Sequence, residues 1–236
     1  MKIVITAGPT REHLDPVRFL SNPSTGKMGF AIAAEAAKRG HDVTLIAGPV
    51  ALKTPKGVKR IDVVSAREML KAARQSVSTS CPDDCSSEHR NIRTSDHRRT
   101  SIVFIATAAV ADWRPKACAK SKLKKNQMSS TLRLVRNPDI LKTVSRLRSS
   151  LSPLPSSLHL IGFAAETDHV LAEAARKCRE KGLSFIVAND VTQKGCGFGT
   201  DTNKVTFVFP DGMRKKFPLM TKRAVAKRIL DEVSRL

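Results

Sequence analysis

The sequence predicts an α/β fold with a doubly wound, mostly parallel sheet and a C-terminal antiparallel hairpin extension. Two observations support it. Short apolar segments typical of buried strands alternate with amphipathic helical segments, and a strand–turn–strand pattern follows the last of these pairs. The chain has 236 residues, 41% of them hydrophobic, which suffices for one substantial core. We therefore expect a single domain over residues 1–236.

The N-terminal part of the chain shows this alternation plainly. KIVITAG (2–8) is expected to be a strand, and 27–40 a helix with small and apolar residues on one face. DVTLIAGP (42–49) is the second strand. Residues 65–77 then form a helix, and Ser65 is a suitable N-cap because its hydroxyl can accept a hydrogen bond from a free N–H group of the first turn.

The rest of the chain continues the pattern and then departs from it. Residues 101–112 are expected to be a buried strand that runs into a turn of small residues, and further strands are expected at 131–137, 158–166 and 184–190. Helices are expected at 139–151, with Pro138 at the first turn, and at 169–182. The chain closes with a hairpin around a Pro-Asp-Gly turn (204–219) and an amphipathic helix (221–236). Right-handed crossovers place the carboxyl ends of the parallel strands, and the ligand, along one edge.

Residues 78–100 do not fit this alternation. The segment is polar, rich in Ser and Thr and without hydrophobic periodicity, which favours a disordered surface insertion. The alternative is a metal site built from Cys81, Cys85, His89 and His97. The spacing of the two cysteines suits zinc, but the two histidines lie too far apart for a finger-type site.

Composition argues against several classes of protein. Five scattered cysteines do not form a disulfide framework, and no apolar run resembles a signal peptide or reaches the ~20 residues of a membrane helix. We therefore expect a cytoplasmic protein that binds no membrane. The formal charge of +21 suggests anionic ligands, but the chain has no tyrosine and one tryptophan, which argues against a base-stacking surface. A basic nucleic-acid-binding module is the non-enzymatic alternative.

The connection between the first strand and the first helix carries the strongest binding signal. Residues 8–29 are far longer than the ~2–6 residues that such a connection needs. They bring Arg18, Asn22 and a Ser-Thr-Gly-Lys stretch to a helix N-terminus, where free N–H groups favour an anion. The spacing fits neither G-x-G-x-x-G nor G-x-x-x-x-G-K-[ST], because Met28 follows Lys27. A surface loop whose glycines serve only tight turns is the alternative.

Three further stretches could line a ligand site. In ATAAVADWRP (106–115), small side chains would admit a ligand to the backbone and Asp112 could accept hydrogen bonds, although close packing explains the run equally well. The segment 114–125, with six cations and no acid, is either a mobile phosphate-binding flap or a solvated loop. Lys177 and Lys181 share one helix face. Many donors and few bases are typical of phosphoryl or nucleotidyl transfer.

The order of these motifs resembles that of the phosphopantothenate–cysteine ligases (phosphopantothenoylcysteine synthetases). The shared stretches, in chain order, are ITAGPTREHLDPVRFLSNPSTGKMG, TAAVAD, KLKK, NPDI, GFAAET and ANDV. The resemblance covers nearly the whole chain except 78–100 and is to the bacterial, CTP-dependent type, which implies a Rossmann-like fold. Bacterial members are often fused behind a flavin-dependent decarboxylase. Because this chain starts at the ligase strand and has no flavin motif, we expect a stand-alone ligase without flavin, beside a possible separate decarboxylase.

The resemblance implies a two-step reaction in coenzyme A biosynthesis. The carboxylate of 4′-phosphopantothenate would attack the α-phosphate of CTP, forming an acyl-cytidylate and pyrophosphate, and the amine of L-cysteine would then displace CMP. Mg²⁺ is expected with the triphosphate, its protein ligands unknown, and a homodimer would share its active sites. An ATP-dependent version of this ligase is one alternative. A nicotinamide-dependent oxidoreductase is another, although GHDVTLIAGPV offers no acidic residue to bind a ribose.

The resemblance also assigns residues. It implies that Asn22 contacts the acyl intermediate and that Lys122 is the catalytic cation of the flap. The implied substrate-binding residues are Arg18 of the neighbouring subunit, Asn22, Ala108, Ala109 and Asp112. The implied nucleotide-binding residues are Gly8, Ser24, Gly26, Gly29, Ala106, Thr107, Asp112, Lys122, Pro138, Asp139, Ile140, Leu141, Phe163, Lys177 and Lys181.

Overall fold

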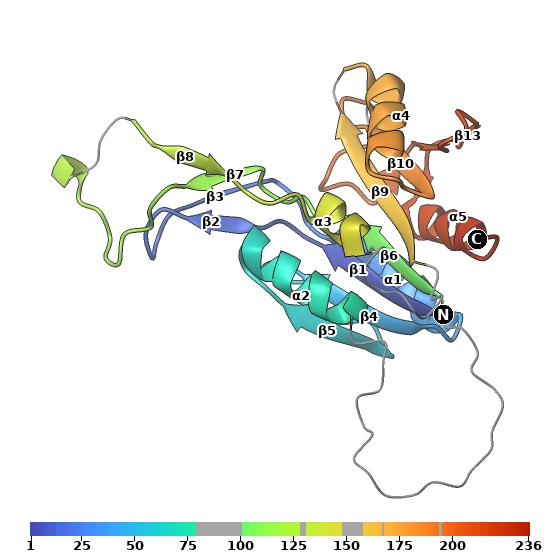
Figure 1. The fold of residues 1–236 in the computed structure, drawn as a ribbon, viewed down its shortest axis with the longest axis horizontal. Helices are drawn as coiled ribbons and strands as arrows, with labels where there is room; N and C mark the ends of the chain where they lie inside the picture. Colours follow the sequence, from blue (N-terminus) through green and yellow to red (C-terminus); the bar gives the residue numbers. More distant parts are fainter. Residues whose placement is uncertain (79–100, 128–130, 148–157, 167, 194) are drawn as a thin grey trace, which may run out of the picture.

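The computed structural model describes residues 1–78, 101–127, 131–147, 158–166, 168–193 and 195–236. These residues build an eight-stranded sheet (Figure 1). Its parallel strands are β1 (Lys2–Ala7), β4 (Asp42–Ala47), β5 (Val58–Asp62), β6 (Ile102–Ala106), β9 (Leu158–Glu166) and β10 (Phe185–Asp190). Two antiparallel strands, β12 (Val205–Val208) and β13 (Arg214–Lys216), complete one edge.

The strand order is β13–β12–β10–β9–β6–β1–β4–β5. Chain order therefore reverses between β1 and β6, which is the arrangement of a doubly wound sheet and marks where such folds bind ligands. In the antiparallel extension, the N–H of Gly212 donates to the carbonyl of Phe209 at 3.1 Å and Gly212 has a φ of +89°. The predicted fold and its C-terminal hairpin are thus confirmed.

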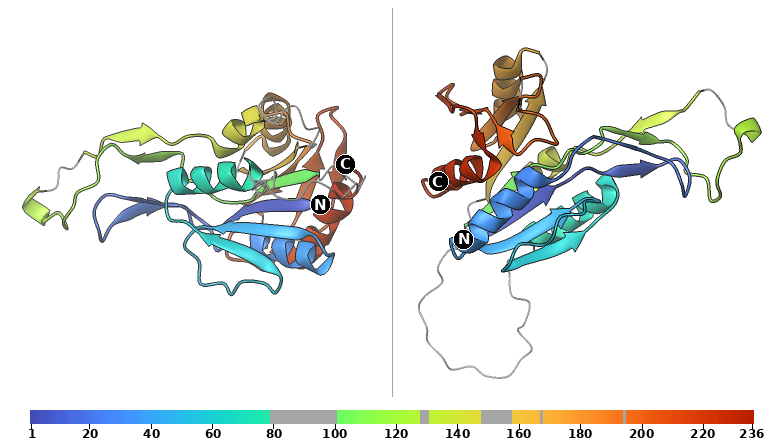
Figure 2. Two further views of the ribbon diagram at one scale, coloured as in Figure 1. Left: turned by 60° about the horizontal axis from the view of Figure 1, so that its bottom comes forward. Right: turned by 180° about the vertical axis from the view of Figure 1, so that it is seen from behind.

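Helices cover both faces of the sheet. Their bounds are α1 (Lys27–Lys38), α2 (Ala66–Ser78), α3 (Ile140–Arg146), α4 (Val170–Glu180) and α5 (Lys222–Val233). Helices α1 and α5 pack together on one face, and α2, α3 and α4 lie on the other (Figures 1 and 2). In β1, the fully buried side chains of Ile3 and Ile5 join the first layer and that of Val4 joins the second. Burial on both faces explains why these strands are continuous apolar runs.

Two short hairpins project together from the sheet as an arm (Figures 1 and 2). One pairs β2 (Arg11–His13) with β3 (Phe19–Ser21), and the other pairs β7 (Trp113–Pro115) with β8 (Leu134–Arg136). The 3₁₀ turn η1 (Lys125–Gln127) lies between β7 and β8 in sequence. We call residues 10–21 and the described residues of 113–136 the arm. The connection 8–29, expected to be a loop, therefore contains a hairpin.

Side-chain hydrogen bonds to free backbone N–H groups explain where helices α2, α3 and α5 begin. The Ser65 hydroxyl accepts from the N–H of Glu68 at 3.3 Å, and the Glu68 carboxylate accepts from the N–H of Ser65 at 3.4 Å, so the Ser65 cap is confirmed as part of a capping box. Thr221 caps α5 in the same way through the N–H of Ala224 at 3.2 Å. At α3, Asp139 is the N-cap, so Pro138 lies before the helix and not in its first turn.

Other predicted bounds need correction. Within 101–112 the strand ends at Ala106 and the expected small-residue segment follows it, whereas only 134–136 of the strand expected at 131–137 pairs with a partner. The edge strand β5 and the small pair β11 (Thr202–Asn203) and β14 (Met220–Thr221) were not predicted. The proposed zinc ligands and residues 79–100 lie outside the described residues, as do residues 148–151. None of the helices in the described part combines the length and apolar character needed to cross a bilayer.

Candidate active site

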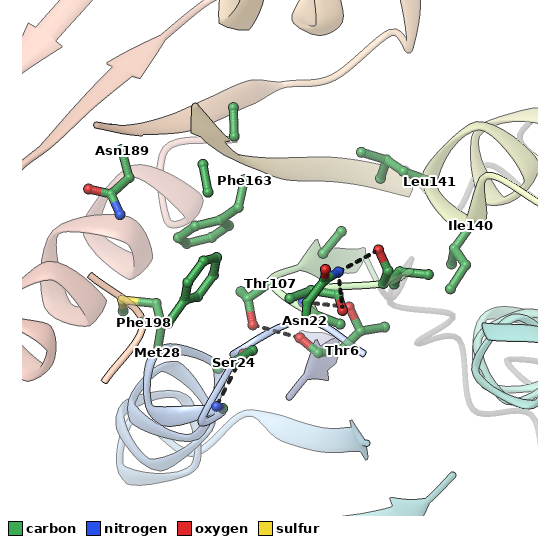
Figure 3. A pocket seen from close by; sticks show the side chains of 18 of the residues that line it. Thr6, Asn22, Ser24, Met28, Thr107, Ile140, Leu141, Phe163, Asn189 and Phe198 are labelled. Carbon is green, nitrogen blue, oxygen red and sulfur yellow. Dashed lines mark hydrogen bonds between the residues drawn. The ribbon is translucent and has the colours of Figure 1, made fainter. Parts of the chain in front are cut away.

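A cavity of about 490 Å³ opens at the carboxyl ends of the parallel strands, beside the reversal between β1 and β6 (Figure 3). This size suits a small-molecule ligand. The segment after β6 forms one wall, the N-termini of α1 and α3 form two more, the ends of β9 and β10 form a fourth, and the loop around Phe198 forms the last. The sequence-predicted residues that line it are Asn22, Ser24, Gly26, Gly29, Ala106, Thr107, Ala108, Ala109, Asp112, Pro138, Asp139, Ile140, Leu141, Phe163, Lys177 and Lys181.

The N-terminus of α1 offers free N–H groups to this cavity. Gly26 occupies the N-cap position with a φ of +76°, no side chain caps the helix, and its first turn holds no acidic residue. Gly29 lets the helix approach the sheet, because a Cβ there would lie 2.5 Å from both the Ala7 Cβ and the Thr107 Oγ1. Gly8 lies beneath, and its Cα would be 3.4 Å from a Cβ at Gly26. Free N–H groups and the helix dipole make this end an anion site.

Asn22 is held in a defined orientation against the segment that follows β6. Its amide nitrogen donates to the carbonyls of Ala109 and Val110, each at 3.1 Å (Figure 3). The segment that supplies these carbonyls is itself tied to the loop after β1, because Ala109 N–H donates to the Gly8 carbonyl at 2.9 Å. Asn22 therefore has its nitrogen committed to the protein, and its amide oxygen remains to accept a hydrogen bond from a ligand.

The α3 wall combines an acidic cap with a lysine. Asp139 accepts from the N–H of Lys142 at 2.9 Å and pairs with the Lys181 ammonium at 2.8 Å. Burial opposes ionisation of Asp139, but these donors outweigh it and hold its pKa below the usual value. Because the Asp139 carboxylate occupies this helix end, the α3 terminus does not offer a second anion site. Asp112 lines the same side with its side chain exposed.

The remaining wall was not predicted from the sequence. Phe198 lies near Met28 and faces Phe163 across the cavity (Figure 3). Its loop is held by the buried ammonium of Lys222, which donates to the carbonyls of Gly197, Phe198 and Thr200 at 3.4, 3.3 and 2.6 Å. Burial is the main cause that lowers the pKa of Lys222, and the nearby Lys27 lowers it further. Asp201 has the opposite effect but is the weakest of the three.

Two amides line this unpredicted wall. The Oδ1 atoms of Asn189 and Asn203 are buried and have no hydrogen-bond partner within the described residues. Such acceptors favour a ligand that brings its own donors, because a buried unpaired acceptor is costly. Asn189 lies in β10 and belongs to the shared ANDV stretch, whereas a Gly-rich stretch around Phe198 was the sequence signal for the rest of this wall. Lys27, expected near the anion, lines the cavity, and its ammonium donates to the Gly199 carbonyl at 3.0 Å and the Asp201 carboxylate at 2.7 Å.

Arg18 and Lys122 do not join this cavity in the described chain. Both lie on the arm. The Arg18 side chain pairs with Asp15, with its Nε donating to Asp15 Oδ2 at 3.0 Å, and Arg18 Nη2 also donates to the Leu123 carbonyl at 2.8 Å. Lys122, next to Leu123, is exposed. No group of three or more His, Cys, Asp or Glu side chains suited to hold a metal occurs among the described residues.

The family model "DNA/pantothenate metabolism flavoprotein C-terminal domain" matches residues 1–81 and 86–236. Among curated relatives, the coenzyme A biosynthesis bifunctional protein CoaBC of Escherichia coli (strain K12) is 43% identical over 236 residues, covering 99% of this chain and 51% of its own length. CoaBC of Bacillus subtilis (strain 168) is 42% identical over 235 residues, with the same coverage of each chain. The chain thus spans about half the length of the curated relatives it matches.

Solved structures agree on the fold. The crystal structure of the C-terminal domain of CoaBC has a TM-score of 0.73 and 39% identity, covering 98% of this chain and 93% of its own. A Cab2 mutant in complex with phosphopantothenate-cysteine has a TM-score of 0.70 and 14% identity, covering 99% of this chain and 86% of its own. At that identity the second likeness bears on the fold alone.

Proposed function

Because this chain belongs to the family of DNA/pantothenate metabolism flavoprotein C-terminal domains, we propose that it is a phosphopantothenate–cysteine ligase that uses CTP. In the first step the carboxylate of 4′-phosphopantothenate attacks the α-phosphate of CTP, so the bond to pyrophosphate breaks and an acyl-cytidylate forms. In the second step the amine of L-cysteine attacks the acyl carbon and CMP leaves. The amide of phosphopantothenoylcysteine is the product.

One observation carries the proposal. A free helix N-terminus and the oriented amide of Asn22 lie in the same cavity at the reversal of the sheet. The first suits a triphosphate and the second suits a reacting acyl group beside it. Positioning of two anionic reactants accounts for much of the rate in such a transfer, because little covalent chemistry is required of the protein.

In this proposal different walls of the cavity bind different parts of the two substrates. Ser24, Gly26 and Gly29 form the cradle for the phosphates, with Gly8 beneath it. Residues 138–141 with Phe163, Lys177 and Lys181 hold the rest of the nucleotide, and Ala106 and Thr107 close its floor. Ala108, Ala109 and Asp112 line the path of the phosphopantothenate carboxylate to the α-phosphate.

Magnesium fits this cavity as a companion of the triphosphate. Mg²⁺ commonly uses one or two carboxylates and takes its other ligands from phosphates and water. Asp112 supplies an exposed carboxylate, whereas Asp139 is already committed to Lys181. Bound there, the ion would neutralise charge on the triphosphate. Asp112 would hold it or the substrate, and the protein adds no larger ligand cluster within the described residues.

The nicotinamide alternative has less support. In a dinucleotide-binding fold an acidic residue after the second strand binds the ribose. Here β4 ends at Ala47 and is followed by Gly48, where a Cβ would lie 1.7 Å from the Pro9 carbonyl oxygen. The loop after β1 therefore packs closely against the turn after β4, and residues 48–53 include no acidic side chain to bind a ribose. Use of ATP in place of CTP remains the alternative within the same ligase class.

The arm supports the proposed homodimer. It exposes large apolar side chains, among them Val17 at 56% and Trp113 at 45%. Grouped exposed apolar residues on a projection are typical of a protein–protein contact. Arg18 also lies on this arm and outside its own cavity, as expected if it serves a neighbouring copy.

The cellular setting is also a proposal. The curated relatives are named bifunctional and are about twice as long. From the family resemblance we propose a phosphopantothenoylcysteine decarboxylase as the partner activity, either separate or joined to this chain. The expected stand-alone organisation, the lack of flavin and the cytoplasmic location stay predictions. Mass spectrometry of the reaction tests the function. The product expected from 4′-phosphopantothenate, cysteine and CTP is phosphopantothenoylcysteine with CMP, and a nucleotide diphosphate product would contradict the acyl-cytidylate route.

A further inference from the structure

The loop of residues 197–201 contacts both residues that flank Gly26 at the start of α1. On one side, the Thr25 hydroxyl donates to the Phe198 carbonyl at 2.9 Å. On the other, the Lys27 ammonium donates to a carbonyl and to the carboxylate of the same loop, at 3.0 and 2.7 Å. No side chain caps this helix, and Gly26 itself has none to contribute. The loop therefore anchors both sides of the anion site.

The loop in turn closes around the ammonium of Lys222, the first residue of α5. The Lys222 side chain is buried, and its ammonium donates to the carbonyls of Gly197, Phe198 and Thr200 at 3.4, 3.3 and 2.6 Å. The Phe198 side chain lines the cavity (Figure 3). Its carbonyl accepts from both Lys222 and Thr25, so a single backbone oxygen joins α5 to the start of α1.

The contacts of Lys222 are those of a small cation held by backbone oxygens. An ammonium carries three N–H donors, and the loop presents three carbonyls to it. A buried charge is costly unless it is hydrogen-bonded, and a neutral side chain of the same length could fill the space but could not donate to these oxygens. Lys215 differs, because its ammonium forms an ordinary ion pair with the Glu232 carboxylate at 2.8 Å.

The side of the cavity assigned to phosphopantothenate is held by other contacts. The Asn22 amide donates to the carbonyls of Ala109 and Val110, each at 3.1 Å. The N–H of Ala109 donates to the Gly8 carbonyl at 2.9 Å. A change in the 197–201 loop should therefore reach the cradle for the phosphates and leave the amide of Asn22 in place.

We infer that Lys222 is a positioning residue for the nucleotide. Its ammonium acts as a built-in monovalent cation that orders the 197–201 loop, and through this loop it holds the start of α1 and the Phe198 side chain in their places at the cavity. Lys222 acts through the loop, because its N–H groups are bound to the loop carbonyls. The choice of CTP as the nucleotide rests on the proposed ligase function.

Two substitutions and a matched control test this role. Lys222→Met keeps an unbranched side chain without the ammonium, and Lys222→Ala leaves an empty space. Loss of hydrogen bonds to a charged group should raise both the Kd and the KM for CTP by at least about 10-fold, with the KM for 4′-phosphopantothenate changed by less than about twofold. Lys215→Met removes a partly buried ammonium outside the cavity and should leave the CTP constants unchanged.

Addition of an amine tests the role of the ammonium itself. The side-chain atoms that Lys222→Ala lacks are those of n-propylammonium, so this ion should lower the Kd of the variant for CTP in a saturable manner, by at least about fivefold. The same concentration of n-propanol should not, because it brings no charge and a single donor. Neither the wild type nor Lys222→Met should respond, since their own side chains occupy the space.

Several results would overturn the inference. One is an equal rise of both KM values in Lys222→Met, which would assign Lys222 to general stability. Another is a folded Lys222→Ala protein that binds CTP weakly and does not respond to n-propylammonium. Loss of folding in both variants would also assign Lys222 to stability alone.

Calorimetric titration with CTP keeps this test separate from that of the proposed function. It measures binding without turnover. A wild-type protein that binds CTP but releases no pyrophosphate would refute the ligase, while the CTP affinities of the Lys222 variants would still decide the role of the ammonium. A wild-type protein that does not bind CTP would overturn both the nucleotide assignment and the inference.

Discussion

Gly29→Ala tests how closely the anion site depends on the packing of α1. The new Cβ would lie 2.5 Å from the Ala7 Cβ and the Thr107 Oγ1, whereas ordinary contacts begin near 3.4 Å. Neither neighbour can yield easily, because Ala7 ends a buried strand and the Thr107 hydroxyl donates to the Thr6 carbonyl at 2.6 Å. The N-terminus of α1 must therefore move outward by about 0.9 Å.

Two magnitudes follow from this displacement. Overpacking of this kind costs about 1–3 kcal/mol of unfolding free energy. A displacement of about 1 Å in the groups that position a reacting phosphate can cost roughly 100-fold in rate. We therefore expect kcat/KM for CTP to fall by about 100-fold while the protein still folds.

Denaturant unfolding and steady-state pyrophosphate release measure the two effects in one preparation. Gly199→Ala is the matched control, because a Cβ at Gly199 has no neighbour within 4 Å. It should change the unfolding free energy by less than about 0.5 kcal/mol. A Gly29→Ala protein with wild-type kcat/KM would refute the assignment of this helix end to the phosphates.

Three further predictions concern the other parts of the site. Asn22→Ala removes the amide that bonds to the Ala109 and Val110 carbonyls, so acyl-cytidylate should still form but accumulate, and normal turnover by quenched-flow analysis would contradict this role. Lys122→Gln should slow pyrophosphate release by at least about 10-fold with little change in KM for 4′-phosphopantothenate, and an unchanged rate would move the catalytic cation elsewhere in the flap. The pKa of Asp15 is lowered in the folded protein, so its contribution to stability is present above about pH 4 and is lost as the pH falls through its folded-state pKa. The difference in unfolding free energy between wild type and Asp15→Asn should therefore shrink from about pH 5 toward pH 2. A difference that stays constant over this range would contradict the ion pair.

The strands of the central sheet could be predicted because each one is recognised from consecutive residues of the sequence. A strand such as 158–166 is an apolar run, and its bounds in the structure are the same. Ser65 could be recognised as a cap because its partner Glu68 lies three residues away. Most cavity-lining residues followed from motifs next to strand ends, where a parallel sheet gathers them at one edge.

The arm could not be predicted because its pairing is not local. Trp113 pairs with Arg136, and β2 contacts β7 from a segment about 100 residues earlier in the chain. Strands of three residues carry no readable alternation. The wall formed by Phe198 and Lys222 could not be predicted for the same reason. The Lys222 ammonium, in α5, binds backbone carbonyls of a loop more than 20 residues earlier, and such a contact produces no pattern in the sequence.

Pyrophosphate release tests the central claim most directly. Purified protein is supplied with 4′-phosphopantothenate and cysteine, and CTP or ATP is added in parallel reactions. The ligase proposed here should release pyrophosphate with CTP and little with ATP. Comparable release with ATP would keep the ligase and overturn the nucleotide preference, and no release with either nucleotide from a folded dimer would contradict the proposed function.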